Sequence, residues 1–390
     1  MIKGLIWPMA LLLLGSEVRA QVDTAKQERF SFHFQNTIIG QYKPSFSAPY
    51  SGQNSLQPGE ETQVSVTATL FTAARLWKGA TLVFNPEMSG GSGLSSTLGL
   101  GAATNGETFR VGDPKPAVYL ARLYLRQLIP LGGSHSFQQG DANQPAAYQP
   151  DSYISLTAGK ISLTDFFDAN DYSHDPRSQF MNWALMASGA WDYAANTRGY
   201  TPGFLGEWVT PRHELRYVFA LLPKTANGNV MNWDMGQSAS QTLEYSYKYH
   251  WRNHPGKISG LAFYNYAGMG DYRQAVANTN PPDVIATRNG VRSKVGGGLN
   301  FQQELTPDVG IFARASMNDG RHETWAFTEI DNSISGGVSV AGTRWHRAGD
   351  TFGAAWVNSG LSDPHRDYLA AGGYGFMLGD GQLNYGRENA

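Results

Sequence analysis

The sequence contains no cysteine and few charged residues. Without cysteine, the chain has no disulfide framework, no thiolate-ligated zinc or iron–sulfur centre and no thiol nucleophile. Charged residues make up 16% of the 390 residues, against about 25% in an average soluble domain. The formal net charge of −2 provides no overall basic field for nucleic acid. The composition therefore excludes disulfide-stabilised proteins, cysteine-ligated metal centres and thiol-dependent enzymes, and it argues against a nucleic-acid partner.

Glycine and aromatic residues are plentiful, with 45 glycines and 12% aromatics. So many aromatics, together with so little charge, argue against disorder. At about 150 residues per domain, the length suggests two or three domains. However, no linker and no fixed-period repeat divides the chain, and one closed β-barrel can use hundreds of residues.

The N-terminus has the layout of a secretory signal peptide. Lys3 precedes an apolar run at residues 4–15, and Val18-Arg19-Ala20 resembles a cleavage site. The apolar run is shorter than the ~20 residues of a spanning helix. We therefore expect residues 1–20 to be removed and residues 21–390 to form a single exported domain.

Apolar and polar residues alternate along most of the mature chain, which is typical of β-strands. In residues 242–251, for example, Leu243, Tyr245 and Tyr247 alternate with Glu244 and Lys248. The alternation predicts fourteen strands, at residues 30–38, 64–71, 81–84, 118–128, 153–160, 204–209, 213–222, 242–251, 258–266, 294–304, 309–316, 338–345, 352–357 and 368–377. These lengths suit tilted membrane strands.

Two β architectures fit this alternation, a soluble sandwich and an outer-membrane barrel. The polar faces carry Arg, Gln, Asn, Ser and Gly with charges of both signs, as in a polar lumen, instead of the many Lys and Glu of a water-facing sheet. Trp77, Trp208, Trp251 and Trp345 lie at strand ends, as in interfacial girdles. Short connectors alternate with long polar ones, which favours an antiparallel outer-membrane barrel.

Strand parity assigns a set of charged residues to the interior of that barrel. In residues 118–128 it places Arg122 and Arg126 inside and Tyr119 on the outer, apolar face. The full set of expected pore-lining charged residues is Arg122, Arg126, Glu214, Arg216, Glu244, Lys248, Glu304 and Arg314, with Arg75 as an additional wall residue.

Residues 163–203 do not alternate. Residues 178–189 have helical spacing, with Pro176 as a start signal, so we expect a short helix in a loop folded into the barrel. Trp183 and Trp191 lie in this loop. Their side chains either pack inside the structure or narrow the pore and offer stacking surfaces to a solute.

The same segment resembles a known family. Gly159-Lys160, DFFDAN at 165–170, DPRSQFMNWALM at 175–186, GAWDYA at 189–194 and RGYT at 198–201 are similar to the carbohydrate-selective porin (OprB-type) family, as are Arg122-Leu123-Tyr124 and NYGRE at 384–388. The resemblance implies a 16-stranded barrel in the outer membrane of a Gram-negative bacterium. It also implies passive diffusion of glucose and related sugars through a narrowed, charged lumen.

The C-terminus departs from that family. Such barrels are expected to close with a strand that ends in an aromatic residue, whereas this sequence ends Arg387-Glu388-Asn389-Ala390. With about fourteen of sixteen strands visible, we expect the last one or two strands to be absent from the sequence.

The residues offer no catalytic site. No G-x-S-x-G, H-E-x-x-H, P-loop or G-x-G-x-x-G motif occurs, so we expect no enzyme activity, no cofactor and no catalytic metal. Asp165, Asp168, Asp171 and Asp175 form an acidic loop without EF-hand spacing. Capping and solvation are its default roles, and a structural calcium site is the open alternative.

Arginine and glutamate suit sugar hydroxyls, and Trp183 and Trp191 would stack on sugar rings. The expected partners are therefore mono- or oligosaccharides in transit and outer-membrane lipid, with the chain a monomer or homotrimer. Two alternatives remain open at this point, a general or anion-preferring porin and a secreted carbohydrate-binding β-sandwich.

Overall fold

A computed structural model describes residues 27–99, 104–107, 115–326, 328–383 and 387–389. The predicted signal peptide, residues 1–20, lies outside the described residues. No helix within the described part is long and apolar enough to cross a membrane.

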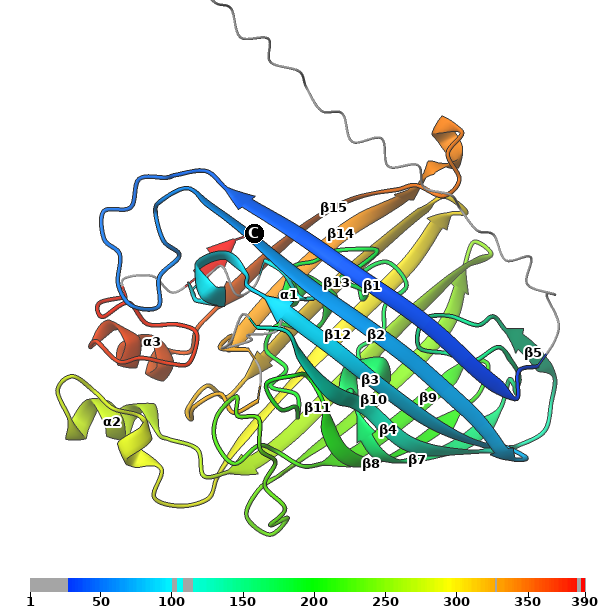
Figure 1. Cartoon of the computed structure of the whole chain (residues 1–390), viewed down its shortest axis with the longest axis horizontal. Helices are drawn as coiled ribbons and strands as arrows, with labels where there is room; N and C mark the ends of the chain where they lie inside the picture. The colour runs from blue at the N-terminus through cyan, green and yellow to red at the C-terminus, as the bar shows by residue number, and fades with distance from the viewer. Residues whose placement is uncertain (1–26, 100–103, 108–114, 327, 384–386, 390) are drawn as a thin grey trace, which may run out of the picture.

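One antiparallel sheet of fourteen strands forms the wall of the molecule (Figure 1). Apart from a small hairpin between β4 and β7, each strand pairs with the next one along the chain. Their order is β1 (Phe30–Lys43), β2 (Glu61–Trp77), β3 (Ala80–Gly91), β4 (Ala117–Pro130), β7 (Tyr153–Ile161), β8 (Thr201–Val209), β9 (His213–Ala220), β10 (Ala239–Trp251), β11 (His254–Ala267), β12 (Arg292–Thr306), β13 (Val309–Asn318), β14 (Asn332–Ala341), β15 (Thr351–Gly360) and β16 (Arg387–Asn389). Within the described ranges no pairing joins β1 to β16.

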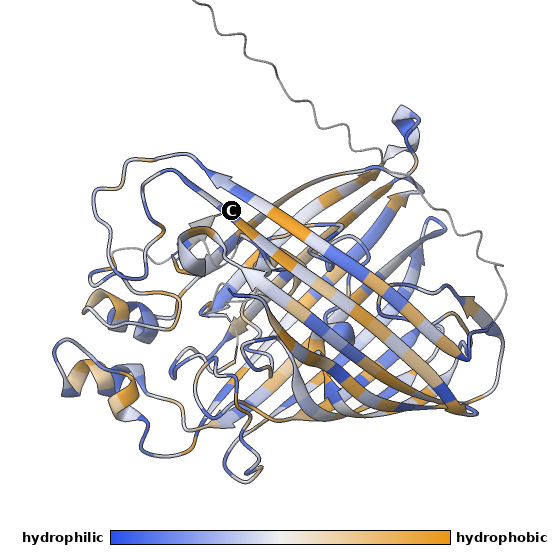
Figure 2. Ribbon diagram, in the orientation of Figure 1, coloured by the Kyte–Doolittle hydropathy of each residue, from blue (hydrophilic) through white to orange (hydrophobic). Residues whose placement is uncertain are grey.

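The two faces of the sheet differ as the alternation predicts. On β10, Leu243 and Tyr245 are 47% and 45% exposed, whereas the intervening Glu244 is 2% exposed. Apolar and polar bands alternate along the strands in Figure 2. Large apolar side chains therefore face outward, where a bilayer would cover them, and polar side chains face the lumen.

The connections are short at one end of the sheet and long at the other (Figure 1). Two residues join β10 to β11 and two join β12 to β13. The hairpin of β5 (His135–Gln138) and β6 (Ala147–Pro150) lies at this short-turn end. The long-loop end carries α2 (Tyr272–Asn278) and α3 (Asp363–Ala370), which pack together through Tyr272, Tyr368 and Leu369.

Twelve of the predicted strands are confirmed, and the one at residues 338–345 is confirmed only as far as Ala341. There β14 ends and the 3-10 helix η5 (Gly342–Trp345) begins, so Trp345 does not lie in a strand. The prediction at residues 368–377 is wrong. That region begins inside α3, because the Ser362 side chain accepts a hydrogen bond from the His365 backbone N–H and Pro364 stands in the first turn. His365, Tyr368 and Leu369 are buried at helical spacing. The short β16 is the fourteenth strand of the sheet.

Residues 162–200 turn inward between β7 and β8, as expected, but their helix is shorter than predicted. It covers only α1 (Trp183–Met186) instead of residues 178–189. A longer helix would need the backbone carbonyls on either side of α1 for its own hydrogen bonds, but these carbonyls accept hydrogen bonds from other groups. The Met181 carbonyl accepts from Gly106 N–H, and the Leu185 carbonyl accepts from Arg314 and Ser173.

Candidate functional site

A row of alternating charges crosses the lumen face of β8, β9 and β10. Glu207, Arg216 and Glu244 are directly opposite one another in the strand register. Arg216 lies 3.2 Å from Glu207, 2.7 Å from Glu214 and 3.5 Å from Glu244. These residues form ion pairs because neighbouring inward positions of antiparallel strands face each other across one rung of the sheet.

Two further cations extend this row. Arg126 lies 3.2 Å from Glu207 and donates a 2.8 Å hydrogen bond to Ser155, while Lys248 pairs with Glu214. Lys257 of β11, opposite Lys248 in the strand register, acts on the same carboxylates. Three carboxylates thus face four cations, so the wall is highly polar and most of its charge is offset locally.

Arg122 fixes the wall of β4 to the inward segment. Its guanidinium binds both carboxylate oxygens of Asp165, at 2.6 and 2.7 Å, and donates to Asn85 at 2.8 Å. A bidentate pair of this kind is strong and directional. A register shift at Asn85–Pro86 also brings Tyr119 inside, where its hydroxyl donates to Glu87. The predicted outward position of Tyr119 is therefore wrong, because the extra residue of a β-bulge reverses parity along the strand.

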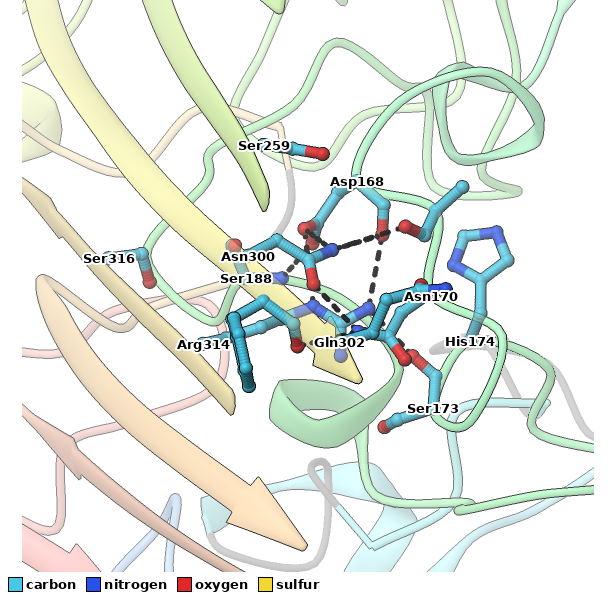
Figure 3. A network of polar contacts seen from close by, with 12 residues as sticks. Asp168, Asn170, Ser173, His174, Ser188, Ser259, Asn300, Gln302, Arg314 and Ser316 are labelled. Atoms are coloured by element: carbon cyan, nitrogen blue, oxygen red, sulfur yellow. Dashed lines mark hydrogen bonds and ion pairs between the residues drawn. The ribbon is translucent and has the colours of Figure 1, made fainter. Parts of the chain in front are cut away.

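Asp168 holds the opposite side of the inward segment against β12 and β13 (Figure 3). Its carboxylate accepts from Ser188 N–H at 2.5 Å, from Asn300 at 2.7 Å and from Arg314 at 3.2 Å. Arg314, 3% exposed, also donates to the carbonyls of Asp168, Leu185 and Ser173 at 3.0, 2.8 and 2.6 Å. Backbone groups from several turns of the inward segment, between residues 168 and 188, are thus gathered around one buried ion pair.

Two more acidic residues of the segment, Asp171 and Asp192, add to this attachment. Gln302 of β12 donates to Asp171 at 2.6 Å and accepts from the Asp171 N–H at 3.0 Å. Farther along the segment, Asp192 accepts from the backbone N–H groups of Trp325 and Ala326 at 2.9 and 2.8 Å. The inward segment is therefore attached over its whole length.

A cavity of about 1080 Å³ lies on the other side of the segment, against β2, β3 and β4. Its charged lining combines cations and carboxylates from the wall, the inward segment and the neighbouring loops: Arg75, Lys78, Arg122, Arg126, Arg177, Glu87, Glu107, Asp141, Asp165, Asp171 and Asp175. Tyr124 and Phe166 add aromatic surface, with their ring centroids 6.4 Å apart. The β5–β6 hairpin borders the cavity at the short-turn end.

Burial changes the ionisation of two groups in this lining. It raises the pKa of Glu107, although Arg177, 2.8 Å away, opposes that rise. It lowers the pKa of His174, which the nearby Arg314 cation lowers further. Glu107 is therefore easier to protonate than a free glutamate, and His174 is harder to protonate than a free histidine.

The pore-lining residues expected from parity fall into three groups. Arg75, Arg122 and Arg126 line the cavity. Glu214, Arg216, Glu244 and Lys248 form the charged row in the wall. Glu304 pairs with His254, and Arg314 holds the inward segment. Parity places each of these side chains on the lumen side, and Arg75, Arg122 and Arg126 are the ones that line the cavity described above.

Comparison with known proteins identifies the family. The family profile of the carbohydrate-selective porins, OprB family, matches residues 53–390. The chain belongs to this family. A porin is a channel, and these porins lie in the Gram-negative outer membrane, which excludes the secreted β-sandwich considered above. No curated protein sequence matches the chain.

Solved structures agree with a porin barrel. OprB of Pseudomonas putida at high pH matches with a TM-score of 0.62 and 14% identity, covering 88% of this chain and 78% of that one. An anion-selective porin of Comamonas acidovorans has a TM-score of 0.38 and 13% identity, covering 92% and 97%. At 14% identity the first match supports the porin-barrel fold alone, and at a TM-score of 0.38 the second carries no argument.

In this carbohydrate-selective porin, several residues that carry the family resemblance attach the inward segment to the wall. Asp165 binds Arg122, Asp168 binds Arg314, and Asp192 caps two backbone N–H groups. Within the described ranges, no group of three or more acidic or histidine side chains is arranged to hold a metal ion. The acidic loop at residues 165–175 instead makes the contacts described above.

Trp183 and Trp191 differ from the expectation that they stack on a solute. They are 5% and 1% exposed and belong to the largest buried cluster. Trp191 packs against Phe167 and Tyr193, at 6.1 and 5.1 Å between ring centroids. Their faces are covered because the segment folds onto itself as well as onto the wall, so the packing interpretation holds.

Sequence reasoning missed several cavity residues. Glu87 lies on β3, where a short predicted strand ended before it. Glu107 and Arg177 form an ion pair between two loops. Neither loop has alternating apolar and polar residues, so strand parity could not assign these side chains to a face. Tyr124 was placed inside, and its position beside two arginines at i±2 is the signal that would have marked it as cavity-lining.

Proposed function

We propose that neutral mono- and oligosaccharides diffuse passively across the outer membrane through the cavity between β2–β4 and the inward segment. The observation that carries this proposal is the lining itself. Ion-paired arginines and carboxylates stand beside partly exposed Tyr124 and Phe166 in one cavity of about 1080 Å³.

The lining suits a sugar for two physical reasons. Arg122 and Arg126 present N–H donors beside carboxylate acceptors, and a hydroxyl can donate and accept at the same time. The apolar C–H face of a pyranose can lie against Tyr124 or Phe166. Because each contact is exchangeable with water, binding stays weak enough for solute to leave, which flux requires. The proposal needs no bond chemistry.

The balance of charge favours uncharged solutes. Arg122 pairs with Asp165, Arg126 with Glu207 and Arg177 with Glu107. One observation supports the alternative of an anion-preferring pore: Arg75 has no carboxylate within 4.0 Å among the described residues. A guanidinium whose charge is offset only by the more distant Glu28 carboxylate would give a modest anion preference on top of sugar passage.

Single-channel recording with added sugar tests the proposal. Glucose and maltodextrin should interrupt the ion current of the wild-type pore in a saturable way, and both should permeate in liposome swelling. Arg122→Gln should raise the half-saturating sugar concentration several-fold. Arg344→Gln is a matched control, because Arg344 is 61% exposed in its side chain and lies outside the cavity. A pore that conducts ions but excludes sugars and ignores them contradicts the proposal.

A further inference from the structure

The loop between β9 and β10 leaves three large apolar side chains exposed. Val230, Trp233 and Met235 are 62%, 66% and 50% exposed, although Asn229, Asn232 and Asp234 beside them are polar. Several large apolar groups so close together on a surface usually mark a contact with another apolar surface.

Backbone hydrogen bonds hold this loop in one conformation. Lys224 N–H donates to the Val230 carbonyl at 2.8 Å, and Asn232 N–H donates to the Leu222 carbonyl at 2.9 Å. The carboxylate of Asp234 accepts from Gly236 N–H at 3.1 Å, which closes the turn that follows. The loop therefore presents Trp233 from an ordered backbone.

The loop lies on the outward side of the sheet. Tyr266 occupies an outward position of β11, and its hydroxyl donates to the Met235 carbonyl at 2.5 Å. Ala239, at an outward position of β10, is nevertheless 0% exposed. Ala239 lies opposite Tyr266 in the strand register, so the Tyr266–Met235 hydrogen bond brings the loop against the outer wall beside Ala239, at the long-loop end of the barrel that also carries α2 and α3 (Figure 1).

We propose that Val230, Trp233 and Met235 form a membrane-surface anchor that lies in the headgroup region of the bilayer. The patch is continuous with the lipid-facing wall, since Tyr264, 43% exposed, packs beside Tyr266 with the ring centroids 5.8 Å apart and the rings tilted by 40°. Tryptophan prefers the headgroup level because its ring is apolar and its N–H is polar. Exposed Lys224 beside Val230 suits anionic headgroups.

Lipid fits this patch better than a second copy of the chain. Three side chains that are one-half to two-thirds exposed offer roughly 350 Å² on one chain. Two copies would therefore bury about 700 Å² in total, whereas a specific protein interface buries about 1,000 Å² or more, counted over both partners. A bilayer surface has no such minimum, because each apolar group inserts independently and gains its own transfer free energy.

Site-specific fluorescence can test the anchor, because the native chain has no cysteine and one introduced thiol is unique. We would attach an environment-sensitive dye through Trp233→Cys and reconstitute the protein in phosphatidylethanolamine–phosphatidylglycerol vesicles. Leu243→Cys on the outward face of β10 is the lipid-facing control, and Thr225→Cys is the polar control on the same loop. Unchanged single-channel conductance verifies that each variant folds.

At position 233 we expect blue-shifted emission and quenching by headgroup-nitroxide lipid several-fold stronger than at position 225. Equal quenching of the dyes at positions 233 and 225 by soluble iodide would contradict the proposed anchor. So would protection from both quenchers combined with dipolar coupling between spin labels at position 233 of separate chains, because that result places a second copy on the patch.

Discussion

Arg314→Met should release the inward segment while the barrel remains intact. In the native protein the Arg314 guanidinium serves the Asp168 carboxylate and the carbonyls of Asp168, Leu185 and Ser173. Removing one member of a buried ion pair costs about 3–5 kcal/mol, and each orphaned carbonyl adds about 1–3 kcal/mol where water does not reach it.

A loss of about 4 kcal/mol changes the ratio of attached to released segment roughly a thousandfold. The strands make their own ladder of hydrogen bonds, so the loss falls on the segment and not on the wall. We therefore expect larger single-channel conductance, frequent transitions between conductance levels and weaker block by maltodextrin.

Two matched variants separate this effect from a general loss of stability. Arg314→Lys keeps the charge but loses the forked geometry, so its conductance should fall between those of the wild type and Arg314→Met. Arg344→Met removes a partly exposed arginine 4.0 Å from Asp308 and should behave as wild type. Wild-type conductance and wild-type noise in a folded Arg314→Met pore would refute the reasoning.

Three further predictions concern the lining and the buried interior. Acidification should shift the reversal potential in the direction of anion selectivity, because protonated Glu107 no longer neutralises Arg177. The shift should begin at a pH above 4.5, since burial raises the pKa of Glu107 above that ordinary value. Glu107→Gln should show the shift already at neutral pH. Trp191→Ala should destabilise the protein by about 3–5 kcal/mol, seen as a lower unfolding temperature, without changing half-saturation by sugar. Lys294→Met should also lower that temperature, since Lys294 lies 4.0 Å from Asp192 and 3.9 Å from Asp331 in a buried site, whereas exposed Lys78→Met should not.

Strand parity predicted much of the wall because one face of each strand meets an apolar environment. That constraint repeats at every second residue, so Glu214, Arg216 and Glu244 were placed inside without knowledge of their partners. It failed at Tyr119, where one bulged residue reverses the parity. It also failed at residues 368–377, where Ser362 and Pro364 start a helix that short-range alternation disguises.

The inward segment was harder to predict, because long-range contacts determine its conformation. Helical spacing at residues 178–189 was real, but Arg314 and Gly106 bind carbonyls that a longer helix would use. The aromatic residues of the segment were equally ambiguous. The sequence does not distinguish a tryptophan on a pore surface from one in a core. Only the fold shows that the Trp191 side chain is buried.

The inward segment is fastened mainly to β12 and β13 through Asp168, Asn300 and Arg314, whereas the cavity faces β2, β3 and β4, where the Arg122–Asp165 pair described above also holds the segment. The side that bears the mechanical attachment is thus separate from much of the side that meets the solute. Substitutions at positions such as Arg75 or Tyr124 can alter which sugars pass without loosening the attachment. The solute specificity of such a pore can therefore change while the attachment of its inward segment stays the same.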